Sequence, residues 1–260
     1  MKRMIYQVSV GKPSKLYKHC IESVKRYCIK FDIDHIVQTK PILVIRPDPF
    51  NTGRSQECVS RPLPLPIYEK ENAFNYFDRY DQIAIIDADI FIRDTAPDIF
   101  EAFGSEANFG AVVERDMPIT NQYKAKILNY SQMQYGRLHP KVDFDPNHLG
   151  YEFMNMGLML MNKSIVKYLR GQTPKQFLER PEFKNFIDGV GTWKWSTDQT
   201  LLNWWIRKEK MKINRMHWKW NGLYSANRKI EHCHFVHFFL KDKLPNQGEN
   251  VEQLMKDINA

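Results

Sequence analysis

An apolar run that two carboxylates interrupt, IAIIDADIFI at residues 83–92, constrains this sequence most. The four β-branched or small apolar residues before Asp87 predict a strand buried on both faces, as in parallel sheets. Residues two apart on an extended chain point to the same side, so Asp87 and Asp89 should face one spot. Two such carboxylates are costly to bury unless a hard divalent cation, which prefers oxygen ligands, lies beside them. The run therefore predicts a metal site, with solvated loop carboxylates as the alternative.

Segments that predict strands alternate with segments that predict helices along the chain. Strands are expected at residues 5–10, 34–38, 109–114, 154–161 and 233–239, besides the Asp-bearing run. Helices are expected at residues 14–29, 68–80, 96–103, 121–135, 164–170, 173–188, 197–210 and 251–259. The proline-rich stretch 40–66 is expected to be an ordered loop with one extended piece at 42–45. This order predicts an α/β fold with a mixed, mostly parallel central sheet flanked by helices, in a single domain over residues 1–260.

The composition limits the kind of partner. The chain has 260 residues and a net charge of +8, which suits polyanionic partners such as nucleotide diphosphates. Its lysines and arginines are scattered, so we expect no nucleic-acid partner. No window approaches the roughly 20 apolar residues of a membrane span, and no signal-peptide core follows Met1, so we expect a soluble, cytoplasmic protein. Four cysteines without zinc-site spacing are expected to be reduced thiols: Cys20, Cys28, Cys58 and Cys233.

Two polar motifs follow, one at the start of a predicted strand and one at the start of a predicted helix. Asn155 opens the strand, and Gly157 two residues later lets another backbone or a ligand approach closely. The amide of Asn155 offers a donor and an acceptor to a sugar hydroxyl, or it satisfies a turn. Asp198 and Gln199 open the helix, where the helix dipole alone would also explain an acidic residue.

Three histidines lie along the last predicted strand. Alternation puts His232 and His234 on one face and His237 on the other, and a single strand histidine is more often a core residue than a ligand. Lys243 follows six residues after His237, and an imidazole and an ammonium at that spacing suit a metal–pyrophosphate site. Lys70, near the start of the helix before the Asp-bearing strand, could also reach a phosphate, with a solvated lysine as the alternative.

Together these motifs resemble the GT-A glycosyltransferases, which have a Rossmann-like fold, and most closely the family-8-like retaining enzymes that use nucleotide-sugar donors. The matching pieces, in the family's order, are Lys70, Asp87-Ala88-Asp89, Asn155-x-Gly157 with Asn162, Asp198-Gln199-x-x-Leu-Asn203, and His237-Phe238 with Lys243. The resemblance covers residues 1–245, and the Asp-Ala-Asp and Asn-x-Gly strands are its specific parts.

The chain departs from the family's pattern in two places. Leu240 stands where the family usually has a glycine three residues after the histidine, and Lys243-Leu244-Pro245 replaces a Lys-Pro-Trp triplet. This leaves His234 open beside His237 as the metal ligand. Val8-Ser9-Val10 stands where the family has an Ala/Thr contact to the nucleotide base, so Ser9 is the candidate there.

The resemblance implies a Mn²⁺ or Mg²⁺ ion held by Asp87, Asp89 and His237, and a nitrogen ligand favours Mn²⁺. It also implies that Lys243 and Lys70 stabilise the diphosphate, and that Asp87 contacts the ribose. Gly157 would then lie beside the donor.

The implied reaction moves a hexose from a nucleotide diphosphate sugar, with UDP favoured, to a glycan or protein-linked glycan acceptor with retention. Asp198 and Gln199 would lie on the reacting face of the sugar, and Asn155 would position donor or acceptor hydroxyls. The irregular region 117–152 is the expected acceptor cleft, together with four tryptophans: Trp193, Trp195, Trp218 and Trp220.

Other functions remain as alternatives. A sugar-nucleotide pyrophosphorylase would need a glycine-rich loop after the first strand, where only Gly11 stands. An inverting transferase would need a carboxylate base, for which Glu114, Asp116 or Glu152 could serve. A non-catalytic nucleotide-sugar or glycan-binding module would keep the fold and lose a metal ligand.

Overall fold

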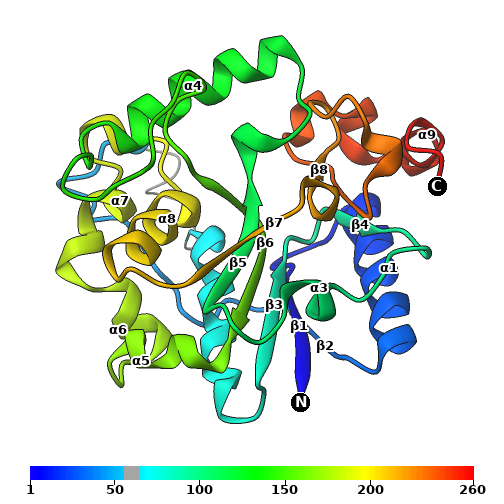
Figure 1. Ribbon diagram of the computed structural model, residues 1–260, viewed down its shortest axis with the longest axis horizontal. Coiled ribbons are helices and arrows are strands. Elements are labelled where there is room, and N and C mark those ends of the chain that lie inside the picture. Colours follow the sequence, from blue (N-terminus) through cyan, green and yellow to red (C-terminus); the bar gives the residue numbers. More distant parts are fainter. Residues whose placement is uncertain (56–64) are drawn as a thin grey trace.

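The computed structural model describes residues 1–55 and 65–260, and a mixed sheet with helices on both faces lies at its centre (Figure 1). Within the described chain the sheet has six strands in the order β2-β1-β3-β6-β5-β7. These are β1 Arg3–Val8, β2 Asp34–Gln38, β3 Gln82–Ile86, β5 Phe109–Val113, β6 Met154–Asn162 and β7 Ile213–Met216. Only β6 runs antiparallel to its neighbours, while the β1–β2, β1–β3 and β5–β7 pairs are parallel. The prediction of a mostly parallel α/β sheet is confirmed.

The central strands are buried on both faces, as the apolar sequence of β3 predicts. Alternate residues of β3 enter two different cores: Ile83 and Ile85 pack in one, and Ala84 and Ile86 in the other. Strand β6 lies beside it, with Met159 opposite Ile85, and all nine of its residues are buried. This doubly covered centre holds the ends of β3 and β6 in fixed positions.

The Asp-bearing run is not one strand, and the prediction of a continuous extended chain there is wrong. β3 ends at Ile86, residues 87–89 form a turn, and β4 Ile90–Ile92 joins a second sheet. The N–H of Ile90 donates to the carbonyl of Asp87 at 3.1 Å and closes this turn. In the second sheet β4 pairs with β9 Phe235–His237, which also pairs with β8 Gly222–Leu223. The two carboxylates therefore lie where the two sheets meet.

Most predicted helices are present. Helix α1 Lys15–Phe31 begins after Ser14, whose hydroxyl accepts from the N–H of Tyr17 at 3.2 Å. Helices α4 Asn121–Tyr135 and α8 Asp198–Lys208 begin after the capping residues Thr120 and Thr197. The remaining α-helices of the described chain are short: α3 Ile99–Phe103, α5 Val166–Leu169, α6 Pro174–Leu178, α7 Lys184–Asp188 and α9 Val251–Asp257. Among the described helices, none is long and apolar enough to span a membrane.

Other predicted boundaries need correction. The segment expected as an α-helix at 68–80 is the 3₁₀ helix η1 Pro66–Asp78, and the helix expected at 173–188 is split by Pro181, which cannot continue the backbone ladder. The expected extended piece at 42–45 is no strand, because Val44 has a left-handed φ of 56°. Strand β7 was not predicted from the sequence. Three cysteines are free and buried, Cys20, Cys28 and Cys233, while Cys58 and residues 56–64 lie outside the described chain.

Candidate functional site

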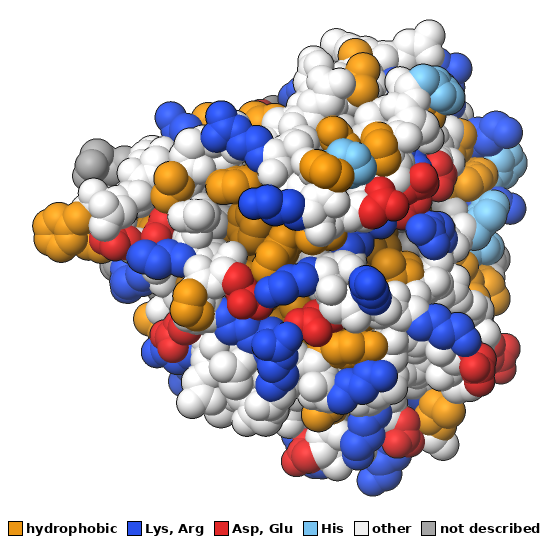
Figure 2. All heavy atoms as spheres, turned by 60° about the vertical axis from the view of Figure 1, so that its left-hand side comes forward, with side chains coloured by type: hydrophobic (Ala, Val, Ile, Leu, Met, Phe, Trp, Pro, Cys, Tyr) orange, Lys and Arg blue, Asp and Glu red, His pale blue; other side chains and the backbone are white. Residues whose placement is uncertain are grey.

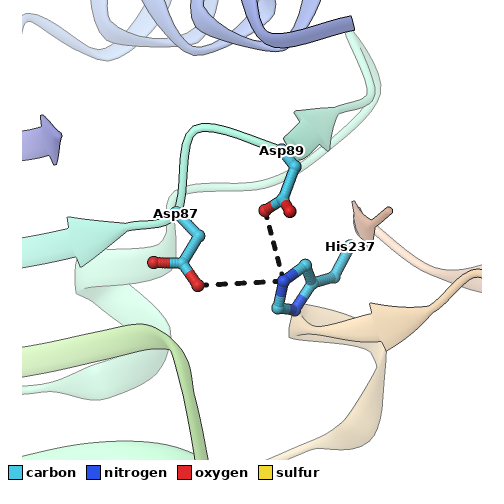
Figure 3. A group of neighbouring side chains, drawn as sticks. All are labelled: Asp87, Asp89 and His237. Atoms are coloured by element: carbon cyan, nitrogen blue, oxygen red, sulfur yellow. Dashed lines mark ion pairs between the residues drawn. The ribbon is translucent and has the colours of Figure 1, made fainter. Parts of the chain in front are cut away.

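Two carboxylates and an imidazole meet at the junction of the two sheets (Figure 3). Asp87 and Asp89 come from the turn between β3 and β4, and His237 is the last residue of β9. The Nε2 atom of His237 lies 3.2 Å from Asp89 Oδ1 and 3.8 Å from Asp87 Oδ2. One ligand atom from each residue lies within 4.8 Å of the other two. His234 is elsewhere, with its ring packed against Trp220 at 4.9 Å.

The backbone around the triad is fixed by hydrogen bonds between the strands. The N–H of Asp87 donates to the carbonyl of Gly157 at 2.8 Å, and the N–H of Phe238 donates to the carbonyl of Asp89 at 3.0 Å. Gly157 also leaves room for the imidazole, because a Cβ there would lie 2.3 Å from Cε1 of His237. The sequence predicted that another group approaches Gly157 closely, and that group is the imidazole ring of His237.

The electrostatics of the triad favour a positive charge between the two acids. Burial lowers the pKa of His237, but the charge of Asp89 and a hydrogen bond to it, with the charge of Asp87, outweigh burial and raise the pKa. Two carboxylates and one imidazole are also a donor set that divalent ions accept, and the nitrogen suits Mn²⁺ better than Mg²⁺. The residues present therefore fit a divalent cation.

Lys70 connects this triad to the start of helix α8. Its Nζ atom lies 2.6 Å from Asp198 Oδ2, 2.9 Å from Asp87 Oδ1 and 3.0 Å from the carbonyl of Met156. Burial lowers the pKa of Lys70, but the two carboxylates outweigh it and hold the pKa above its usual range. The contacts with Asp87 and Met156 are hydrogen bonds and the contact with Asp198 is an ion pair, so this ammonium group is held entirely by groups of the protein.

The amides of Asn155 and Gln199 also have protein partners. The Oδ1 atom of Asn155 accepts from the N–H of Gly157 at 2.9 Å and from Asn221 Nδ2 at 2.8 Å. Its Nδ2 atom donates to Glu114 Oε1 at 2.7 Å. Gln199 accepts from the N–H of Met156 at 3.2 Å, which ties the first turn of α8 to β6. Asn155 is therefore buried, and its hydrogen bonds hold neighbouring residues of the site in place while part of it lines the cavity.

A cavity of about 640 Å³ opens over these residues. Nine of the residues predicted from sequence line it: Ser9, Lys70, Asp87, Asp89, Asn155, Gly157, Asp198, Gln199 and His237. Lys243 does not line it, and contributes instead to a separate cavity beside α4. Among the lining residues that the sequence did not single out are Tyr17, Ile67 and Phe239. Tyr17 could have been found, because the first turn of α1 follows the carboxyl end of β1, where open α/β sheets place ligands.

Comparison with known proteins gives a match in structure alone. No protein-family model and no curated protein matches the chain. Mouse xyloside xylosyltransferase 1, in its apo form, superimposes with a TM-score of 0.52 at 13% identity, over 94% of this chain and 100% of that one. An active-site mutant of LgtC gives 0.50 at 14% identity, over 98% and 96%. The bifunctional glycosyltransferase WbbM gives 0.50 at 12% identity, over 99% of this chain and 49% of the other.

The chain has the GT-A glycosyltransferase fold. The predicted resemblance is thus confirmed at the level of the fold.

In this GT-A fold, the carboxylates considered as a base for an inverting reaction lie outside the described lining of the cavity. Burial raises the pKa of Glu152, but hydrogen bonds from Arg215 and Arg207 outweigh burial and lower it. Burial raises the pKa of Glu114, which lies behind Asn155.

The described lining also contains none of the four tryptophans expected in the acceptor cleft. Trp220 is buried, while Trp195 is 65% exposed.

Proposed function

We propose that this protein is a metal-dependent glycosyltransferase that moves a hexose from a UDP-sugar to a glycan or protein-linked glycan. The observation that carries the proposal is the triad of Asp87, Asp89 and His237 at the base of a cavity in a GT-A fold. The solved structures with this fold include enzymes named for sugar transfer, which supports the reaction class.

A Mn²⁺ or Mg²⁺ ion is the proposed cofactor, held by Asp87, Asp89 and His237. When bound, it supplies positive charge for the departing nucleoside diphosphate. The chain's own contribution is a fixed position for the ligands, because Lys70 holds Asp87 from the side opposite the cation site and Gly157 admits the imidazole.

The nucleoside is assigned to the part of the cavity at the carboxyl end of β1. Ser9 follows that strand, its N–H already donates to the carbonyl of Gln38 at 2.8 Å, and the ring of Tyr17 forms a neighbouring wall. A tyrosine ring offers an apolar face to a base. Asp87, at the next strand end, is assigned to the ribose.

The sugar is assigned to the side of the cavity formed by α8. Asp198 and Gln199 begin this helix, and Lys70 fixes the Asp198 carboxylate at 2.6 Å. A carboxylate and an amide oxygen held there would stabilise the positive charge that develops at the anomeric carbon. The acidic residues of the described lining are Asp87, Asp89 and Asp198, and each contacts Lys70 or His237, so none is left as a base for inversion; this favours retention.

A nucleic-acid partner is not part of the proposal. Figure 2 shows Lys and Arg side chains over one face of the molecule with Asp and Glu side chains between them, rather than one basic stripe. The proposal also takes residues 1–260 to form a single GT-A domain.

The test is a screen of UDP-sugars for hydrolysis and thermal stabilisation with and without Mn²⁺. We expect Mn²⁺-dependent hydrolysis that Asp89→Ala abolishes while its circular-dichroism spectrum stays native. Asp94→Ala is the matched control, because the Asp94 side chain is 79% exposed and outside the cavity. Undiminished hydrolysis by Asp89→Ala would refute the metal assignment, and binding without turnover would leave the binding-module alternative. The anomeric configuration of the product, read by NMR, separates retention from inversion.

A further inference from the structure

Beside the main cavity lies a smaller one of about 160 Å³, between the first turns of α4 and the segment after β9. The two segments are in contact, since the ring of Tyr123 on α4 packs edge-on against Phe239 at 5.7 Å. In Figure 1 the green helix α4 reaches the orange region around β8. Leu240 lines both cavities, so they share a wall.

Two lysines with the same charge line this smaller cavity. Lys126 comes from α4, and Lys243 comes from the 3₁₀ turn η8 Lys241–Lys243 that Leu240 precedes. The nearby Lys243 side chain and its like charge lower the pKa of Lys126. Both side chains are exposed, so water screens most of their repulsion, and an anion between them would be attracted by both charges.

The rest of the lining is neutral in the described chain. It contains no Asp or Glu, and neither lysine is in an ion pair with any described residue. The hydroxyl of Ser225 and the amide of Gln122 add uncharged hydrogen-bond donors to the same walls. A small cavity with two ammonium groups and neutral donors has the chemistry of an oxyanion site.

We propose that this cavity binds an anionic group, a phosphate, sulfate or carboxylate, carried by the acceptor. The proposal rests on the function proposed above and deepens it, because it makes the acceptor an acidic sugar or glycan. An acceptor hydroxyl near Asp198 and Gln199 would place its charged substituent past Leu240, against Lys126 and Lys243. The donor diphosphate is the other source of such a group, but the described lining of this cavity includes none of the triad residues.

The probes are glucose 6-phosphate and glucose, which share a ring and differ in charge, titrated into the full chain by calorimetry. We expect glucose 6-phosphate to bind measurably more tightly than glucose. Lys126→Ala should weaken that binding by about tenfold, the usual worth of one charge-assisted hydrogen bond. Lys124→Ala is the matched control, since it removes another exposed lysine of α4 that does not line the cavity.

A second titration separates the two sources of the anion. If the site belongs to the acceptor, glucose 6-phosphate binds equally well when UDP and Mn²⁺ are saturating. Displacement by UDP would assign the lysine pair to the donor and overturn the proposal. So would equal binding of the two probes, or equal effects of Lys126→Ala and Lys124→Ala. Mn²⁺-dependent UDP-sugar hydrolysis, measured on the same samples, reports independently on the proposed function.

Discussion

The imidazole of His237 lies over the α-carbon of Gly157, where any Cβ would come within 2.3 Å of its Cε1 atom and 2.7 Å of its Nδ1 atom. Both atoms belong to a ring, and the ring ends a strand that is paired on both sides by β4 and β8. Because this pairing holds the backbone of His237, a Cβ at position 157 would force the ring to turn, so the empty volume at Gly157 sets where His237 points.

We therefore expect Gly157→Ala to weaken Mn²⁺ binding by at least about tenfold, as displaced ligand supports usually do. Calorimetric titration with Mn²⁺ measures this. Gly110→Ala is the matched control, because its Cβ would also be crowded, at 2.7 Å from the Phe103 ring, but on β5 and away from the triad. The idea fails if both variants bind Mn²⁺ as the native chain does.

Lys70 is expected to be essential to stability, because it lies between two carboxylates of which Asp198 is almost fully buried. Lys70→Met leaves that carboxylate without a partner, and breaking a buried pair in this way costs about 3–5 kcal/mol. Urea denaturation should show this loss, and adding Asp198→Asn should recover most of it because no buried charge then lacks a partner. A double variant as unstable as Lys70→Met alone would contradict the electrostatic explanation. Lys208→Met, in a partly exposed pair with Glu182, should cost about 1 kcal/mol or less.

The sequence predicted those parts of the site that local pattern controls. The apolar residues before Asp87 gave the buried strand, and Asn155-x-Gly157 gave the position where a side chain of another strand approaches. Both follow from side-chain period and glycine geometry, which act within a few residues.

The parts that were missed depend on contacts between distant segments. The turn at residues 87–89 forms because β4 pairs with β9 in a second sheet, and no local signal marks that pairing. The partners of Lys70 come from three separate segments, so its ion pairs could not be read from its own helix. The spacing of Lys243 from His237 predicted a shared site, but the turn at Leu240 directs the chain to α4.

Leu240 adopts a left-handed φ of 59°, which costs a non-glycine residue about 1–2 kcal/mol. The conformation suits the glycine that the family usually has at this point. Leu240→Gly should therefore be more stable than Leu240→Ala by about 1 kcal/mol, since both lose the side chain and only glycine relieves the strain. Thermal unfolding of the two variants measures the difference. Ile29, an exposed position inside α1, is the control: there the alanine variant should be more stable than the glycine variant, because alanine favours the helix. If Leu240→Ala were more stable than Leu240→Gly, the backbone at Leu240 would not be strained.

Glu71 is expected to make stability fall as the pH rises. Its side chain is 1% exposed, and neither carboxylate oxygen has a hydrogen-bond partner among the described residues. Burial and then the charge of Asp198 raise its pKa well above the usual value, with Lys70 opposing them. The folded state therefore holds a neutral carboxyl, whereas the unfolded chain releases that proton above about pH 4.3. Stability from this group is full below that pH and declines as the pH rises towards the folded-state pKa.

Glu71→Gln keeps the shape of the side chain and removes the titration. The free energy of unfolding of Glu71→Gln minus that of the native chain should therefore increase from pH 4 to pH 8. Urea denaturation at several pH values measures it, and taking the difference cancels the other titrating groups. Glu252→Gln is the control, because that side chain is 81% exposed on α9 and its difference should stay flat. A flat difference for Glu71→Gln would mean that the carboxylate is charged in the folded protein and has a partner that stabilises it.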